Sequence, residues 1–147
     1  MSVEAGVPWA RVWAVGRALA ALALVLLATT WPISDFQDHP HWFRVEWLPF
    51  SQYQRPFDVV ANVLLFVPFG AAAAAGTTDR RRVRLVMYGG LALALAVELS
   101  QVYTHNRVAT TTDVITNTAG AWLGARWALT RARTRPTLGA ARARASS

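Results

Sequence analysis

Four long apolar stretches, separated by polar or charged segments, dominate the pattern of the chain. They cover about residues 12–30, 58–75, 83–102 and 113–129. Each has the length, roughly 17 to 20 residues, that an α-helix needs to cross the hydrocarbon core of a bilayer. Helices of a water-soluble bundle carry a polar face, and these stretches carry almost none. The pattern therefore predicts an all-α, integral membrane four-helix bundle.

The first stretch also resembles a secretory signal peptide, because a basic flank precedes it. No clear A-x-A cleavage site follows it, and three further stretches accompany it. We therefore interpret it as a retained helix. Arg17 interrupts it near one end, where a long basic side chain can extend to the membrane interface.

Arginines predict the orientation of the bundle, because basic residues concentrate on the cytoplasmic side of a membrane. They flank the start of the first stretch, the turn between the second and third, and the end of the fourth: Arg11, Arg17, Arg80, Arg81, Arg82, Arg84, Arg126, Arg131, Arg133, Arg135, Arg142 and Arg144. The first connection (31–57) holds two arginines against three acidic residues, and the third holds Arg107 alone. We expect two helical hairpins in a bacterial plasma membrane, with residues 1–11 and a disordered basic tail (131–147) both cytoplasmic.

Composition excludes several other classes of protein. Hydrophobic residues make up 54% of the 147 residues and charged residues 16%. The net charge of +7 does not indicate nucleic-acid binding, because the arginines flank the apolar stretches instead of covering one face. The chain has no cysteine, which excludes disulfides, thiolate nucleophiles and cysteine metal sites. No motif for a cofactor appears, and we expect none to be bound.

The first connection carries many aromatic residues among prolines and charges: Trp31, Trp42, Phe43, Trp47, Phe50, Tyr53 and Phe57. Tryptophan and tyrosine favour the headgroup level of a bilayer. We expect this segment to lie along the outer surface as an interfacial anchor. The alternative is a lid over an outer pocket.

Polar residues enter the predicted spans at one depth, near their outer ends. Three pairs have spacings that place both members on one helix face, and one arginine lies in the loop nearby. The predicted outer polar cluster is Asp58, Asn62, Glu98, Gln101, Arg107, Asp113 and Asn117.

Each member of this cluster also has a structural interpretation. Asp58 and Asp113 open their spans and suit helix N-caps, and the asparagines suit hydrogen bonds between helices. Glu98 is harder to explain, because it lies near a helix C-terminus, inside the interface, where negative charge is disfavoured. It needs a partner, a proton or access to water, and Arg107 is the best candidate partner. A structural Glu98–Arg107 ion pair and a shared binding site both remain open.

Three carboxylates at one depth suit a hard cation such as Mg²⁺ or Ca²⁺, but no spacing here is diagnostic of a metal, and we predict none. A weak internal repeat is present, because the residues from Asp58 to Asn62 resemble those from Asp113 to Asn117. Two hairpins related by an axis along the membrane normal would produce such a repeat.

Small residues predict tight packing in the fourth span. Gly120 and Gly124 form a GxxxG pattern that allows close helix approach. Contact inside one monomer explains it better than dimerisation. Pro68 and Gly70 of the second span are assigned to helix packing as well.

These residues together resemble the VanZ-like family. The matching motifs are Asp58-x-x-x-Asn62, Leu65-Phe66-Val67-Pro68-Phe69-Gly70, Glu98-x-x-Gln101, Arg107, and Asp113-x-x-x-Asn117-x-x-Gly120-x-x-x-Gly124. They span roughly residues 45–129. His105-Asn106 departs from the small or glycine-containing turn expected before Arg107.

The resemblance implies a small multi-pass membrane protein, and the family's namesake is linked to teicoplanin resistance. The resemblance does not assign a reaction to this chain. We therefore keep three hypotheses. The first is an envelope protein that binds an amphiphile, such as a lipoglycopeptide or a lipid-linked wall precursor, beside membrane lipid. The second is a membrane enzyme acting on a lipid-linked precursor, and the third is a structural or assembly subunit.

Overall fold

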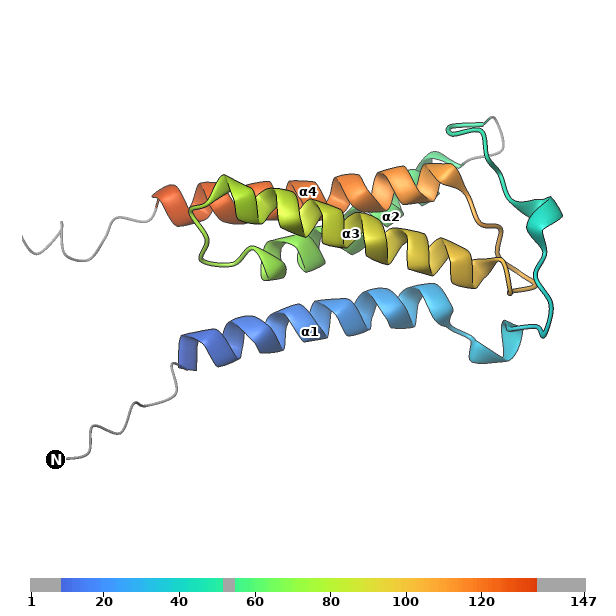
Figure 1. The fold of residues 1–147 in the computed structure, drawn as a ribbon, viewed down its shortest axis with the longest axis horizontal. Helices are drawn as coiled ribbons and strands as arrows, with labels where there is room; N and C mark the ends of the chain where they lie inside the picture. Colours follow the sequence, from blue (N-terminus) through green and yellow to red (C-terminus); the bar gives the residue numbers. More distant parts are fainter. Residues whose placement is uncertain (1–8, 52–54, 135–147) are drawn as a thin grey trace, which may run out of the picture.

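Four long helices form the protein, as the computed structural model shows for the residues it describes, 9–51 and 55–134 (Figure 1). They are α1 (Trp9–Thr30), α2 (Pro56–Ala73), α3 (Arg80–Gln101) and α4 (Thr111–Thr134), with two short 3₁₀ helices, η1 (Ile33–Asp35) and η2 (Trp42–Arg44). The described residues contain two isolated β-bridges but no strand. The predicted all-α class is therefore confirmed for this part of the chain.

The helix ends differ slightly from the predicted spans. α3 begins at Arg80 because the side chain of Asp79 caps it, accepting a 2.8 Å hydrogen bond from the Arg81 N–H. The arginines expected in the turn thus belong to the helix. α4 continues to Thr134, so residues 131–134 of the expected tail are helical. The remaining tail and residues 1–8 lie outside the described residues.

Three of the described helices are long and apolar enough to cross a membrane: α1 over Val12–Thr30, α2 over Pro56–Ala73 and α3 over Arg80–Gln101. In the most apolar 18-residue windows of α1 and α2, only 11% of the residues are buried inside the protein. Their large apolar side chains therefore face outward, where a surrounding lipid phase would accept them.

α4 is the exception among the four predicted spans. It is the longest helix, at 24 residues, yet it does not reach the apolarity of the other three. It packs closely against α2 and α3 and buries a row of small and polar residues, including Thr112, Thr116 and Asn117. The buried face of α4 does not need the apolarity of a face that contacts lipid, while its opposite face carries exposed large apolar side chains such as Trp122 and Trp127.

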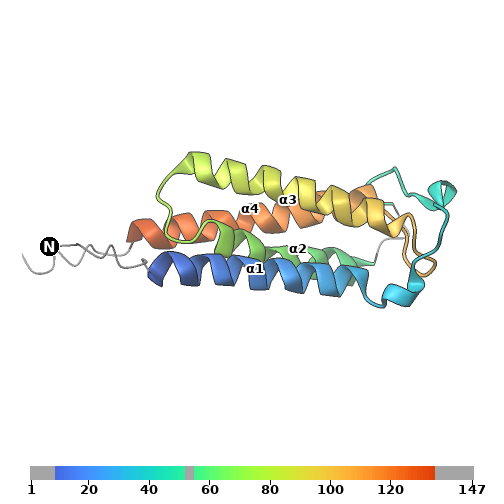
Figure 2. The ribbon, with the colours of Figure 1, turned by 60° about the horizontal axis from the view of Figure 1, so that its bottom comes forward.

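The helices run alternately up and down, so the bundle has two distinct ends (Figures 1 and 2). The start of α1, the α2–α3 turn and the end of α4 lie at one end, which we name the terminal end. The described connecting residues 31–51 and 102–110 lie at the other, which we name the loop end.

Glycines bring α2 and α4 into close contact. A methyl group added at Gly120 or Gly124 would overlap the carbonyl oxygen of Val63 or Val67, respectively. One added at Gly70 would overlap the carbonyl oxygen of Ala121. The GxxxG pattern therefore packs inside one chain. Pro68 lies outside this contact, because its side chain is exposed and lines a cavity beside α1.

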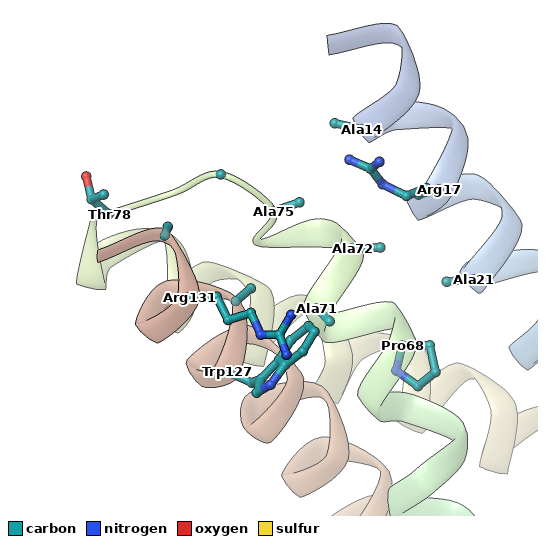
Figure 3. Close-up of a pocket in the computed structure, with 13 residues that line it drawn as sticks. Ala14, Arg17, Ala21, Pro68, Ala71, Ala72, Ala75, Thr78, Trp127 and Arg131 are labelled. Atoms are coloured by element: carbon teal, nitrogen blue, oxygen red, sulfur yellow. The ribbon is translucent and has the colours of Figure 1, made fainter. Parts of the chain in front are cut away.

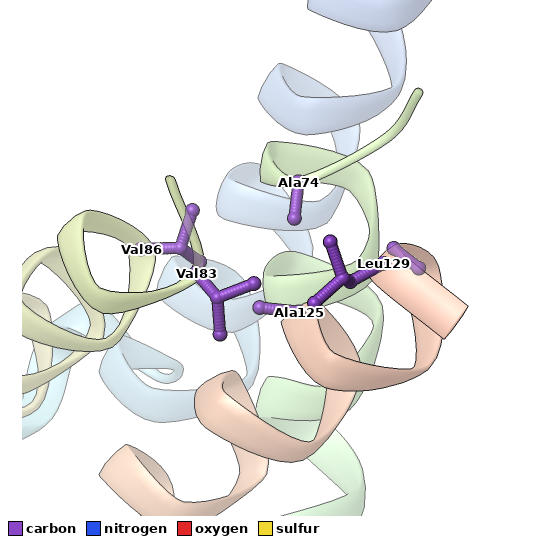
Figure 4. Packing of buried hydrophobic residues seen from close by; sticks show 6 residues of the cluster. Ala74, Val83, Val86, Ala125 and Leu129 are labelled. Atoms are coloured by element: carbon purple, nitrogen blue, oxygen red, sulfur yellow. The ribbon is translucent and has the colours of Figure 1, made fainter. Parts of the chain in front are cut away.

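Two clusters of buried apolar residues surround this contact. The first, at the terminal end, joins α2, α3 and α4 and consists of Ala74, Val83, Val86, Ala125, Ala128 and Leu129 (Figure 4). The second adds α1 and consists of Val25, Phe66, Ala94 and Ala121. Most of these side chains are small, so the helices can approach closely along their whole length.

Hydrogen bonds tie the two connections of the loop end together. The N–H groups of Gln37 and His41 donate to the carbonyl oxygens of Tyr103 and Val102, at 2.7 and 2.8 Å. The backbone of Glu46 forms two further hydrogen bonds. Its N–H donates to the Ala109 carbonyl oxygen at 3.0 Å, and its carbonyl oxygen accepts from the Thr111 N–H at 3.0 Å. The first connection therefore covers this end of the bundle.

The aromatic residues of the first connection face outward. Trp31, Trp47 and Phe43 are 67%, 70% and 85% exposed, while Tyr53 lies outside the described residues. Exposed rings suit the expected interfacial anchor. The hydrogen bonds to the second connection also suit the alternative, a lid, so one segment combines features of both.

Candidate functional site

A cavity of about 680 Å³ opens at the loop end, and we name it the polar cavity. All seven residues of the predicted outer cluster line it. Its complete lining is Ala28, Thr29, Glu46, Asp58, Ala61, Asn62, Leu65, Glu98, Gln101, Asn106, Arg107, Val108, Thr110, Asp113 and Asn117. The four helices and both loop-end connections therefore contribute to one cavity.

Asn62 and Asp113 connect α2 with α4 across this cavity. The Nδ2 of Asn62 donates a 2.6 Å hydrogen bond to Oδ1 of Asp113. Each residue comes from a different copy of the Asp-x-x-x-Asn motif. The reciprocal bond, between Asp58 and Asn117, is absent from the described residues.

Thr110, not Asp113, caps α4. Its Oγ1 accepts a 3.0 Å hydrogen bond from the N–H of Asp113, as an N-cap side chain does. In a capping box the carboxylate of the third helical residue would accept the N–H of Thr110 in return. Here Glu98 takes that N–H instead, at 2.8 Å from its Oε2. The carboxylate of Asp113 therefore remains available to Asn62 and the cavity.

Glu98 is 6% exposed and lies one turn inside α3. The ion pair with Arg107, one of the two alternatives for Glu98, is not formed among the described residues. Arg107 instead donates through one guanidinium nitrogen to the carbonyl oxygens of Ala28 and Trp31, at 3.0 and 3.3 Å. Arg107 binds there because the last carbonyls of α1 lack helical partners and the negative end of the helix dipole favours a cation.

The amide of Asn117 faces the cavity with one group unsatisfied. Asn117 is 2% exposed, and its Oδ1 has no hydrogen-bond partner among the described residues. The side chains of Asp58 and Gln101 also form no hydrogen bond there. A buried acceptor without a donor is costly and rare, and among the described residues of the lining this oxygen is the one side-chain atom that is both buried and unpaired.

Acidic residues predominate among the charged residues of the cavity lining. Glu46, Asp58, Glu98 and Asp113 supply carboxylates, and Arg107 supplies the single guanidinium of the lining. Arg107 is already bonded to α1. A molecule that brings hydrogen-bond donors or positive charge would therefore complement this lining.

Comparison with known protein families agrees with the motifs that line this cavity. The family model described as VanZ/LLP1 matches residues 14–131. The chain belongs to the VanZ/LLP1 family. The predicted VanZ-like membership is thus confirmed, and the match extends beyond the motif region to include most of α1. Comparisons with curated proteins and with solved structures gave no significant match.

The arrangement in this VanZ/LLP1 protein does not resemble a metal centre. Within residues 9–51 and 55–134, no group of three or more histidine, cysteine or acidic side chains is placed to hold a metal ion. The four acidic side chains of the lining come from four different elements of the cavity wall.

Reasoning from the sequence missed part of the lining of the VanZ/LLP1 site. Glu46 lies in an irregular segment, where no periodicity predicts which way a side chain points. Thr110 matters through its backbone N–H, which Glu98 accepts. The sequence signal for Thr110 was the pattern Thr-x-x-Asp at the start of the fourth span, which resembles a capping box.

Proposed function

We propose that this VanZ/LLP1 protein is a multi-pass protein of the bacterial cell membrane that binds the polar head of an amphiphile in the polar cavity. In this proposal the chain crosses the bilayer four times, with both termini cytoplasmic and the cavity near the outer leaflet. The three apolar helices support the membrane location. The arginines gathered at the terminal end support the orientation, by the positive-inside rule.

The unpaired Oδ1 of Asn117 is the observation that carries this proposal. Helix packing alone gives no reason to bury an amide oxygen without a donor, and it leaves that oxygen destabilising. A rotation of the amide would turn this oxygen toward the cavity, where a ligand hydroxyl or amine that donates to it would remove this cost. The carboxylates of Glu98 and Asp113 line the same cavity and would accept further donors.

The lining also favours one kind of ligand over another. Four acidic side chains and one guanidinium that is already bonded to α1 offer few donors to the pyrophosphate of a lipid-linked wall precursor. A lipoglycopeptide such as teicoplanin presents many N–H and O–H donors together with an acyl chain. Ala28, Ala61 and Leu65 supply apolar wall on α1 and α2, where such a chain would leave the cavity.

Equilibrium binding to the purified protein in lipid nanodiscs tests this proposal. We expect labelled teicoplanin to bind, and a glycopeptide without an acyl chain to bind at least about tenfold more weakly, a difference of about 1.4 kcal/mol. Glu98→Gln should weaken teicoplanin binding by a similar factor. Asp38→Asn is the matched control, because it removes an acidic residue from the same end whose side chain is 94% exposed and lies outside the cavity.

Growth of a deletion strain tests the link to resistance. Wild-type and Asp38→Asn genes should restore tolerance to teicoplanin, whereas Glu98→Gln should not. Equal binding of teicoplanin by wild type and Glu98→Gln would contradict the proposed role of the cavity. Equal tolerance of strains with and without the gene would contradict the link to resistance.

A further inference from the structure

A second cavity, of about 790 Å³, lies at the terminal end between α1, α2 and α4 (Figure 3). It exists because α1 packs mainly on α2 and hardly touches α4. Most of its wall consists of alanines from these three helices. We name it the arginine cavity, because Arg17 of α1 and Arg131 of α4 line it from different walls, beside Trp127.

The two arginines have no acidic partner among the described residues. Among the described residues, Asp79 is the one acid at the terminal end, and its carboxylate caps α3. Arg17 forms no hydrogen bond or ion pair with the described residues, and Arg131 stacks on the Trp127 ring, 4.4 Å from its centroid. Both guanidinium groups therefore keep donors free for an anion.

The position of Arg17 favours an anionic partner. It lies about two turns into α1, roughly 12 Å along the axis from Trp9, within a segment apolar enough to span a membrane. A charged group at that depth is costly unless it is paired or reaches the headgroup level. Arginine binds phosphate oxygens in a bidentate manner, which satisfies its charge and its donors together.

The alanine walls indicate what kind of anion fits. A soluble phosphate needs only the charged part of the cavity and would leave the wall formed by Ala21, Pro68 and Ala72 unused. An acyl chain would cover it. We propose that the arginine cavity binds an anionic phospholipid, with its phosphate between Arg17 and Arg131 and an acyl chain along the alanines. This inference is independent of the polar cavity, which lies at the opposite end of the bundle.

Binding of phosphatidylglycerol labelled on its acyl chain, to delipidated protein in detergent, tests the proposal. We expect Arg17→Gln and Arg131→Gln each to weaken binding by about tenfold, as loss of a charge-assisted phosphate contact does. Arg84→Gln should change it less than about twofold. Arg84 is the matched control, because it is exposed at the same end but does not line the cavity.

Two further measurements separate the possible occupants. Unlabelled phosphatidylcholine and inorganic phosphate should each compete poorly. Ala72→Leu, which fills the apolar part of the cavity without changing charge, should also weaken binding. The proposal is overturned if phosphatidylcholine competes as well as phosphatidylglycerol, if inorganic phosphate displaces the lipid, or if Arg17→Gln binds like Arg84→Gln. Arg17→Gln alone suffices where Arg131→Gln fails to fold, since Arg17 makes no hydrogen bond within the described protein.

Discussion

Asn62 of α2 donates a 2.6 Å hydrogen bond to the carboxylate of Asp113 on α4, joining the two Asp-x-x-x-Asn motifs of the chain. The motifs are therefore not independent helix caps. Asn62 joins two helices through this hydrogen bond. Its counterpart Asn117 lines the polar cavity and has a buried, unpaired oxygen. Asp113 is likewise bonded, while its counterpart Asp58 is exposed at the cavity. If the two segments arose as a repeat, their roles have diverged.

The first prediction concerns this bond. Asn62→Ala should lower the free energy of unfolding by about 1 kcal/mol, in the range measured for hydrogen bonds between membrane helices. Thr118→Ala is the control, because the Thr118 hydroxyl bonds only within its own helix, to Val114. Unfolding in detergent should show a clear difference between the two variants. Equal stability would mean that the Asn62–Asp113 bond does not join the helices.

The second prediction concerns the contact of α4 with α2. Gly124→Ala should destabilise the fold by about 1–3 kcal/mol, because the new methyl group would overlap the Val67 carbonyl. Gly89→Ala is the matched control, since a methyl group added there meets nothing within 4 Å. Thermal unfolding should show no loss for Gly89→Ala. Tolerance of Gly124→Ala would show that α2 and α4 are farther apart.

The third prediction concerns Arg107 as the link between α1 and the second connection. Arg107→Gln should leave the carbonyls at the end of α1 with weaker hydrogen-bond partners. The free energy of local unfolding at this helix end should fall by about 1 kcal/mol. Amide exchange at Trp31, whose N–H bonds the Leu27 carbonyl, should then become about fivefold faster. Arg55→Gln, an exposed change at the same end, should leave that exchange unaltered. Unchanged exchange in Arg107→Gln would contradict this link and favour the alternative, an ion pair between Arg107 and Glu98.

The fourth prediction concerns orientation. The chain has no cysteine, so single cysteines can report which side of the membrane a residue faces. Ser34→Cys at the loop end should react with an impermeant maleimide on intact cells. Thr78→Cys at the terminal end should react only after the membrane is opened. The reverse pattern would contradict cytoplasmic termini.

The sequence predicted the helices well because apolar length is a local property. The four expected spans match α1 to α4 to within a few residues at each end, and Asp79 and Thr110 cap the starts of α3 and α4. It did not reveal that α4 packs against both α2 and α3. This packing depends on tertiary structure, and the glycines at 120 and 124 indicated close contact without naming the partner.

The candidate site was predictable where polar residues interrupt apolar helices, because such residues are costly in a membrane. All seven of them line one cavity. The bonding within the site was not predictable in the same way. Glu98 and Arg107 are close in sequence and opposite in charge, yet the free carbonyls at the end of α1 bind Arg107 and the Thr110 N–H binds Glu98.

Photoaffinity mapping tests the central claim most directly, because it locates the ligand's head. A teicoplanin probe with a photoreactive group near its peptide core would be cross-linked to the protein in nanodiscs. We predict cross-links on segments that line the polar cavity, around residues 58–65 and 98–117, and their loss in Glu98→Gln but not in Asp38→Asn. Cross-links spread over the outward apolar faces of α1 and α2, and unchanged by Glu98→Gln, would contradict it.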